Sequence, residues 1–208
     1  TLPLTLFPYT TLFRSQCSIK NELSEWETIF NGKNLDGWTV KVKGYPSGDN
    51  FGNTFKVVDE AIQVSYENYD NFDFKFGHIY YTEKKYKNYH LKLEYKFFGN
   101  QAIGGEGWAT KNSGIMFHSQ HPETMLIDQS FPVSLEAQFL GGLGDGKRPT
   151  GNLCTPGTDV DIDFEKVKSH CTQSSSETYH SDDWVKAEIV VYNRSEEHTS
   201  ELQSPVTI

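Results

Sequence analysis

The sequence lacks any apolar run that could cross a bilayer, since no stretch approaches the roughly 20 apolar residues that a spanning helix needs. Positive charge is also scarce: 19 Lys and Arg stand against 28 Asp and Glu, which gives a net charge of -9. Nucleic acids and anionic membranes bind basic surfaces, so neither is expected as a partner. A chain of 208 residues is long enough for one domain with a real core and too short for two.

Cysteine is rare as well, with only three in the chain. Cys154 and Cys171 bracket a loop rich in Pro, Gly, Ser and Asp. A disulfide between them would stabilise the fold by about 3 kcal/mol in the chain-entropy model. It would also place the protein outside the reducing cytoplasm, in the periplasm or cell envelope. Two unpaired thiols are the alternative.

The two ends of the chain are similar to translated adapters from short-read DNA sequencing. The letters TLFPYTTLFRS occupy residues 5–15, and RSEEHTSELQS occupies residues 194–204. We therefore expect 1–15 and 194–208 to be non-biological, 16–25 to be a linker, and 26–193 to form the domain. Cys17, followed by a polar stretch, is similar to the lipid-anchored start of a bacterial lipoprotein; an exposed cysteine in a frayed terminus is the alternative.

Helix signals are scarce, and short alternating apolar runs separated by Gly, Asn, Asp and Pro predict an all-β sandwich. Asp59-Glu60 is expected to form a tight turn between two strands, although it lacks the favoured glycine. Lys41-Val42-Lys43 is interpreted as a solvated strand face. The predicted strands are residues 55–58, 61–65, 79–82, 90–98, 113–118, 133–140 and 184–192.

Aromatic residues are plentiful for so polar a chain, at 14% with a mean hydropathy of -0.58. Such rings occur where sugar faces stack on Trp and Tyr, and also in large cores. Trp108 and Tyr45 are candidates for sugar stacking, with core packing or loop anchoring as the alternative for each.

Three motifs carry a resemblance to a known family. The chain reads IFNGKNLDGW over residues 29–38, Asn-Ser-Gly-Ile over 112–115 and Ser-Leu-Glu-Ala-Gln over 134–138. In this order and spacing they resemble the 3-keto-disaccharide hydrolase family, which implies a concanavalin A-like jelly-roll β-sandwich. The family's closing strands, expected after Tyr192, are absent, which would leave a sheet edge and part of the core exposed. His118 stands near a position where the family often has Arg.

The E-x-Q strand brings a carboxylate and an amide together. If Val133, Leu135, Ala137 and Phe139 form the buried set, then Ser134, Glu136 and Gln138 share the opposite face. Ordinary glycoside hydrolysis needs two carboxyl groups, and Gln138 cannot carry a proton. The two-carboxylate mechanism is therefore poorly supported.

The resemblance instead implies an enzyme, a glycoside hydrolase or lyase, acting on sugars already oxidised at C3. A base could remove the acidified C2 proton, the group at C1 would leave by β-elimination, and water could add back. The enolate would need a divalent metal ion or hydrogen-bond donors. We assign Glu136 as base or metal ligand, His118 as metal ligand or acid/base group, and Gln138 and Asn112 as donors to sugar hydroxyls.

Two loop histidines, His121 and His180, could also bind substrate, although loop histidines are more often solvated. His170, beside Cys171, is interpreted as structural. The rival function is a non-catalytic carbohydrate-binding module, and a third is a secreted structural or adhesion domain. A concave pocket that gathers Glu136, Gln138 and His118 would favour the enzyme, whereas a shallow aromatic platform would favour the binding module.

Overall fold

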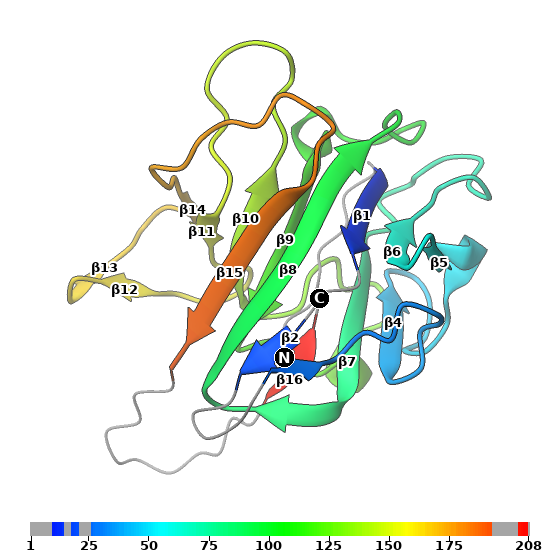
Figure 1. The fold of residues 1–208 in the computed structure, drawn as a ribbon, viewed down its shortest axis with the longest axis horizontal. Coiled ribbons are helices and arrows are strands. Elements are labelled where there is room, and N and C mark those ends of the chain that lie inside the picture. Colours follow the sequence, from blue (N-terminus) through cyan, green and yellow to red (C-terminus); the bar gives the residue numbers. More distant parts are fainter. Residues whose placement is uncertain (1–9, 15–17, 21–25, 193–203, 208) are drawn as a thin grey trace.

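The computed structural model describes residues 10–14, 18–20, 26–192 and 204–207, almost all of them strand or loop (Figure 1). Cys17 and most of both end segments lie outside the described residues. Three short 3-10 turns interrupt the loops, at Phe51–Asn53 (η1), Gly107–Ala109 (η2) and Pro122–Thr124 (η3). Within the described ranges, no helix has the length and apolar character to span a membrane.

One layer of the fold is an antiparallel sheet built around the long strand β8 (Tyr89–Phe98). Strand β15 (Val185–Val191) pairs with β8 over its whole length. On the other side of β8 the sheet continues to β5. The remaining strands of this layer are β1 (Thr10–Arg14), β2 (Ser18–Lys20), β3 (Glu27–Thr28), β5 (Phe55–Val58) and β6 (Ala61–Val64).

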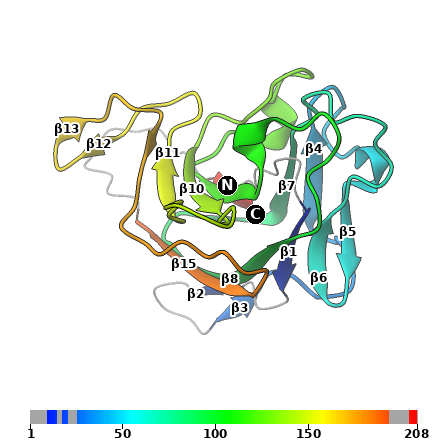
Figure 2. The ribbon, with the colours of Figure 1, turned by 90° about the horizontal axis from the view of Figure 1, so that it is seen from above.

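The second layer consists of two antiparallel sheets that lie side by side over the first, as Figure 2 shows. One has the order β14-β11-β10-β9, and the other β16-β7-β4, with β16 also contacting β9. The strands are β4 (Trp38–Val42), β7 (Gly77–Tyr86), β9 (Asn112–Phe117), β10 (Leu135–Leu140), β11 (Asn152–Cys154), β14 (Cys171–Thr172) and β16 (Ser204–Thr207). A separate hairpin, β12 (Asp161–Ile162) with β13 (Glu165–Lys166), projects from this side of the molecule (Figure 1).

One hydrophobic core joins the two layers. Ile79 of β7 and Ile115 and Phe139 of β9 and β10 belong to the same buried cluster as Leu93 of β8. The rings of Tyr95 and Phe139 stack across the layers with centroids 4.1 Å apart. Burial of this apolar surface holds the layers together. The predicted all-β sandwich is confirmed.

The strand with the clearest alternating pattern behaves as predicted. In β8, Leu91, Leu93, Tyr95 and Phe97 are buried while the residues between them are half-buried. The turn of the IFNGKNLDGW motif is also present: Gly32 has a φ of 72°, and the Asn31 side chain accepts hydrogen bonds from two following backbone N–H groups. Only the short polar side chain and the glycine allow this turn.

The expected buried set of the E-x-Q strand is wrong at Val133, which is 45% exposed. Strand β10 begins only at Leu135, because the backbone of Val133 is bonded to Gln120 in the preceding loop. Of the four residues, only Phe139 is fully buried. The period of two fixes which side chains share a face from Leu135 onward, but it does not separate buried from exposed residues: Leu135 and Ala137 are half-buried, whereas Ser134 and Glu136 are buried.

The interpretation of residues 41–43 as a solvated strand face is also wrong. Lys41 is 1% exposed, and its ammonium group donates hydrogen bonds to the carbonyls of Val42, Tyr45 and Ile127. The loop containing Ile127 crosses this face of β4, and its carbonyl replaces the water that a lysine normally keeps. Burial lowers the pKa of Lys41.

The turn between β5 and β6 offers a test of the local energetics. Asp59 and Glu60 form it with φ values of 49° and 60°, in the left-handed region that favours Asn and Gly. Replacing the pair by Asn-Gly should stabilise the protein by about 1 kcal/mol. The measurement is the urea midpoint at an unchanged slope, with Glu60→Ala as the control that keeps a Cβ. An unaltered midpoint for Asn-Gly would show that the turn is not strained.

Candidate active site

The candidate site lies on the face of β9, β10 and β11 that points away from the core, called here the polar face. The register places Glu136 opposite Met116 and Cys154, and Gln138 opposite Gly114 and Asn152. The residues of this face are therefore Asn112, Gly114, Met116, Glu136, Gln138, Leu140, Asn152 and Cys154. Their neighbours in sequence, such as Ile115 and Phe139, enter the core instead.

Glu136 is the most unusual residue of the polar face. It is only 3% exposed, and its Oε1 atom has no hydrogen-bond partner among the described residues. The side chain lies across Gly114, where any Cβ would collide with Oε1. The glycine of the Asn-Ser-Gly motif thus makes room for the glutamate of the facing strand.

Burial without a partner decides the protonation state of Glu136. Removing a carboxylate from water is costly unless hydrogen bonds or an opposite charge replace the hydration. The desolvation raises the pKa of Glu136 from 4.5 to about 8. The carboxyl group is therefore mostly protonated at neutral pH and becomes a base in the mildly alkaline range.

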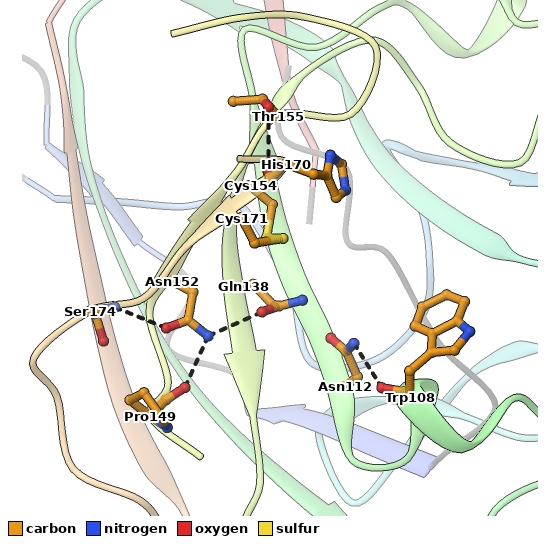
Figure 3. Close-up of a disulfide and its surroundings, with 10 residues drawn as sticks. All are labelled: Trp108, Asn112, Gln138, Pro149, Asn152, Cys154, Thr155, His170, Cys171 and Ser174. Carbon is orange, nitrogen blue, oxygen red and sulfur yellow. Dashed lines mark hydrogen bonds between the residues drawn. A yellow bond between two sulfur atoms is a disulfide. The ribbon is translucent and has the colours of Figure 1, made fainter. Parts of the chain in front are cut away.

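Two of the three amides of the polar face, Gln138 and Asn152, are oriented by their neighbours (Figure 3). Asn152 Nδ2 donates to Gln138 Oε1 at 3.1 Å and to the Pro149 carbonyl at 3.0 Å, while Ser174 N donates to Asn152 Oδ1. Gln138 Oε1 therefore already accepts a hydrogen bond, and its Nε2 points toward Asn112 in Figure 3. Gln138 therefore presents a donor on this face.

Asn112 presents the opposite group. Its Nδ2 donates to the carbonyl of Trp108 at 3.4 Å, and its buried Oδ1 has no partner among the described residues. The expectation that Asn112 donates to a sugar hydroxyl is therefore revised to accepting from one. Trp108 lies beside it in Figure 3, 53% exposed and stacked on Phe76 with ring centroids 6.0 Å apart.

The disulfide expected between Cys154 and Cys171 is present and closes the edge of the polar face (Figure 3). It links β11 to β14 at paired positions, and Cys154 lies directly opposite Glu136 on the neighbouring strand. The carbonyl of His170 beside it accepts hydrogen bonds from the backbone N–H and the hydroxyl of Thr155. The disulfide thereby fixes the strand on which Asn152 and its hydrogen bonds depend.

The other expected site residues lie elsewhere. His118 follows β9 with a φ of 50° and lines a hollow of about 360 Å³ together with Ser134, Leu135 and Asp159; Glu136 does not line it. Its side chain is exposed, although partial burial of the ring lowers its pKa. His180 lines a second, polar hollow of about 540 Å³ and accepts a hydrogen bond from Gly144 N.

Two more candidates serve the structure of their own loops. His121 caps the η3 turn by accepting a hydrogen bond from Glu123 N at 3.4 Å. Tyr45 stacks on Phe51 with ring centroids 4.0 Å apart and packs against the core. Neither residue lines either of the two hollows.

The donor set does not fit the metal site that was expected at Glu136 and His118. Across residues 26–192, no three His, Cys, Asp or Glu side chains are grouped so that they could hold a metal ion. The nearest neighbours of Glu136 by register are Met116 and a disulfide-bonded cysteine, which are poor ligands for a hard divalent ion.

Sequence reasoning missed His78. It alternates with the core residue Ile79 on β7 and so lies, like Glu136, on the side of its layer away from the core. It is 1% exposed, and neither ring nitrogen has a hydrogen-bond partner in the described part of the chain, although the Lys41 backbone approaches it. Burial, and then the charge of Lys41, lowers the pKa of His78 to about 3, so the ring is neutral. The sequence offered no alternating signal for it, because the first five residues of β7 are all buried.

These features define a β-sandwich that carries a buried carboxyl group and oriented amides on one sheet face. A family model described as 3-keto-alpha-glucoside-1,2-lyase-like domain matches residues 25–201, and the chain belongs to this family. The resemblance noted in the sequence is therefore confirmed. No curated protein and no solved structure matches the chain.

The raised pKa of Glu136 should change how the free energy of unfolding depends on pH. Because the folded-state pKa of about 8 exceeds the unfolded value near 4.5, the protein loses stability as pH rises between these values. Glu136→Gln removes this loss, so its advantage over the parent should grow from pH 5 to pH 9, to on the order of 4 kcal/mol.

Urea unfolding at a series of pH values measures the effect. Glu188→Gln is the matched control, because hydrogen bonds from Lys92 and His90 lower the pKa of that exposed carboxyl. Its contribution to stability is fully present above the unfolded-state pKa, so the difference between this variant and the parent should not grow from pH 5 to pH 9. Parallel pH curves for the parent and Glu136→Gln would mean that Glu136 is not desolvated.

Proposed function

We propose that this protein cleaves the glycosidic bond of 3-keto-glycosides, with Glu136 as the base that removes the C2 proton. The family supports the substrate class. The observation that carries the proposal is the buried Glu136 carboxyl group, whose Oε1 has no partner and whose pKa is raised to about 8. Perturbed carboxyl groups of this kind are concentrated at catalytic sites.

The reaction balances with one carboxyl group. The C3 ketone acidifies the C2 proton, and ionised Glu136 takes it. The electron pair left on C2 forms a C1–C2 double bond as the bond from C1 to the leaving group breaks, and the leaving group takes a proton from water. Water can then add its hydroxyl to C1 while C2 regains a proton, which gives net hydrolysis.

The raised pKa suits both halves of this sequence. A base with a pKa close to the working pH accepts a proton readily and can return it in the next step. The low-dielectric surroundings favour the neutral acid that forms when Glu136 accepts the proton.

The neighbouring amides support binding of a sugar ring and give no second carboxyl group. Gln138 offers Nε2 as a donor, suited to a ketone or enolate oxygen, and Asn112 offers Oδ1 as an acceptor for a hydroxyl. Across the polar face defined above, Glu136 is the only acidic side chain. Elimination with a single base therefore fits better than the two-carboxylate mechanism.

The same proposal includes a location outside the reducing cytoplasm. The Cys154–Cys171 disulfide supports it, because such bonds persist mainly in oxidising compartments.

The described residues around Glu136 do not supply a ligand set for a metal ion, so the proposed steps use only the carboxyl group and the amides.

Activity should depend on ionised Glu136. With a 3-keto-glucoside as substrate, Glu136→Gln should lower kcat by about 10²–10⁴-fold, the range for loss of a general base. In the parent protein kcat/KM should rise about tenfold per pH unit below pH 8 and level off above it, because the free enzyme must lose the Glu136 proton.

Release of the leaving group is the measurement, and Glu188→Gln, on the other layer, is the control that should remain active. Equal rates for the parent and Glu136→Gln would contradict the proposal. Tight sugar binding without turnover in the parent would favour a carbohydrate-binding module instead.

A further inference from the structure

Arg148 joins three segments that are far apart in the sequence. Its Nη1 donates to the carbonyls of Lys111 and Gly141 at 3.0 and 2.5 Å, and its Nη2 donates to the carbonyl of Trp108 at 3.4 Å. Its own backbone N–H donates to Thr178 Oγ1. The guanidinium therefore ties the η2 turn to the start of β9 and the end of β10.

Partial burial of the Arg148 guanidinium costs free energy, and the three carbonyls it contacts suit its geometry. The side chain is half-buried, and burial lowers its pKa. In the part of the chain that the structure describes, it forms no ion pair with a carboxylate. Its planar fork reaches the three carbonyls from two separate nitrogen atoms, whereas a lysine has only one nitrogen to place among them.

The group that Arg148 holds lies next to the candidate site. The Trp108 carbonyl accepts from Arg148 and also from Asn112 of the polar face. The indole rests on Phe76, yet Trp108 remains 53% exposed. A large ring that is fixed by its backbone and open to solvent is suited to stacking on a sugar face.

The strand spacing places Asn112, which donates to the Trp108 carbonyl, about one sugar unit from the carboxyl group. Glu136 lies across Gly114, and Asn112 is two residues further along the same face of β9. Two residues of strand span about 7 Å, close to the size of a pyranose ring. When the C2 proton of the keto ring lies at Glu136, the group attached at C1 can extend toward Trp108.

We propose that Arg148 is a positioning residue that holds Trp108 as the stacking platform for the leaving group. This rests on the proposed function, because it takes Glu136 to mark the position of the keto ring. Arg148 itself touches no substrate and acts through the backbone of Trp108.

The kinetic test compares 3-ketomaltose, whose leaving group is glucose, with methyl 3-keto-α-glucoside, whose leaving group is methanol. Arg148→Ala should raise KM for 3-ketomaltose roughly tenfold, the equivalent of one lost stacking contact, with kcat within about twofold. KM for the methyl glycoside should not change. For Arg148→Lys, KM for 3-ketomaltose should lie between the values for the parent and for Arg148→Ala. Lys147 is an exposed residue of the same loop, and Lys147→Ala should match the parent.

A double-mutant cycle separates positioning from general damage. If Arg148 acts through Trp108, Arg148→Ala should have no further effect in a Trp108→Ala background. Additive effects, or equal losses with both substrates, would overturn the proposal.

A binding experiment tests the same proposal without catalysis. Maltose binding is followed by the emission of Trp108, taken as the difference between the parent and Trp108→Phe. Weaker binding in Arg148→Ala but not in Lys147→Ala supports the proposal, and unchanged binding overturns it. Normal maltose binding with no cleavage of either keto-sugar would instead count against the proposed function.

Discussion

The structure of the site depends on one constraint, the burial of the Glu136 carboxyl group without a partner for Oε1. Leaving such a group unsatisfied costs roughly 1–3 kcal/mol or more. The neighbouring strand β9 must also leave room for the Glu136 side chain, which explains the glycine at position 114. The fold thus gives up stability on the polar face, a common feature of sites that bind a reactive ligand.

The surrounding elements keep that carboxyl group in place. The core side of β10 is anchored by the stacking of Phe139 on Tyr95, so the strand cannot rotate to relieve Glu136. On the polar side, Asn152 orients Gln138 and is bonded in turn to the loops at Pro149 and Ser174. The disulfide fixes the end of β11 that carries Asn152.

The sequence allowed the prediction of features that follow from local alternation or from turn chemistry. The faces of β8 and the pairing of Glu136 with Gln138 on one face of β10 follow from the period of two. The turns at Asn31-Gly32 and Asp59-Glu60 were also predictable, the second without its usual glycine.

The features that could not be predicted depend on where long loops lie. Lys41 is buried because a loop some 86 residues further along the chain crosses β4. Arg148 reaches Trp108 across 40 residues, and no local pattern announces that contact. His118 follows β9 directly, yet its left-handed backbone places it in a hollow that Glu136 and Gln138 do not line, so neither described hollow gathers the three residues as expected. Such long-range placements decide which polar residues surround a site.

The protonation state of Glu136 is the central claim, and carbon-13 NMR of glutamate labelled at the carboxyl carbon measures it directly. The signal absent from Glu136→Gln identifies the residue in spectra recorded across the pH range. The account predicts a titration midpoint near 8 for this signal. A midpoint at the ordinary value of about 4.5 would contradict it, because the carboxylate would then be solvated or paired.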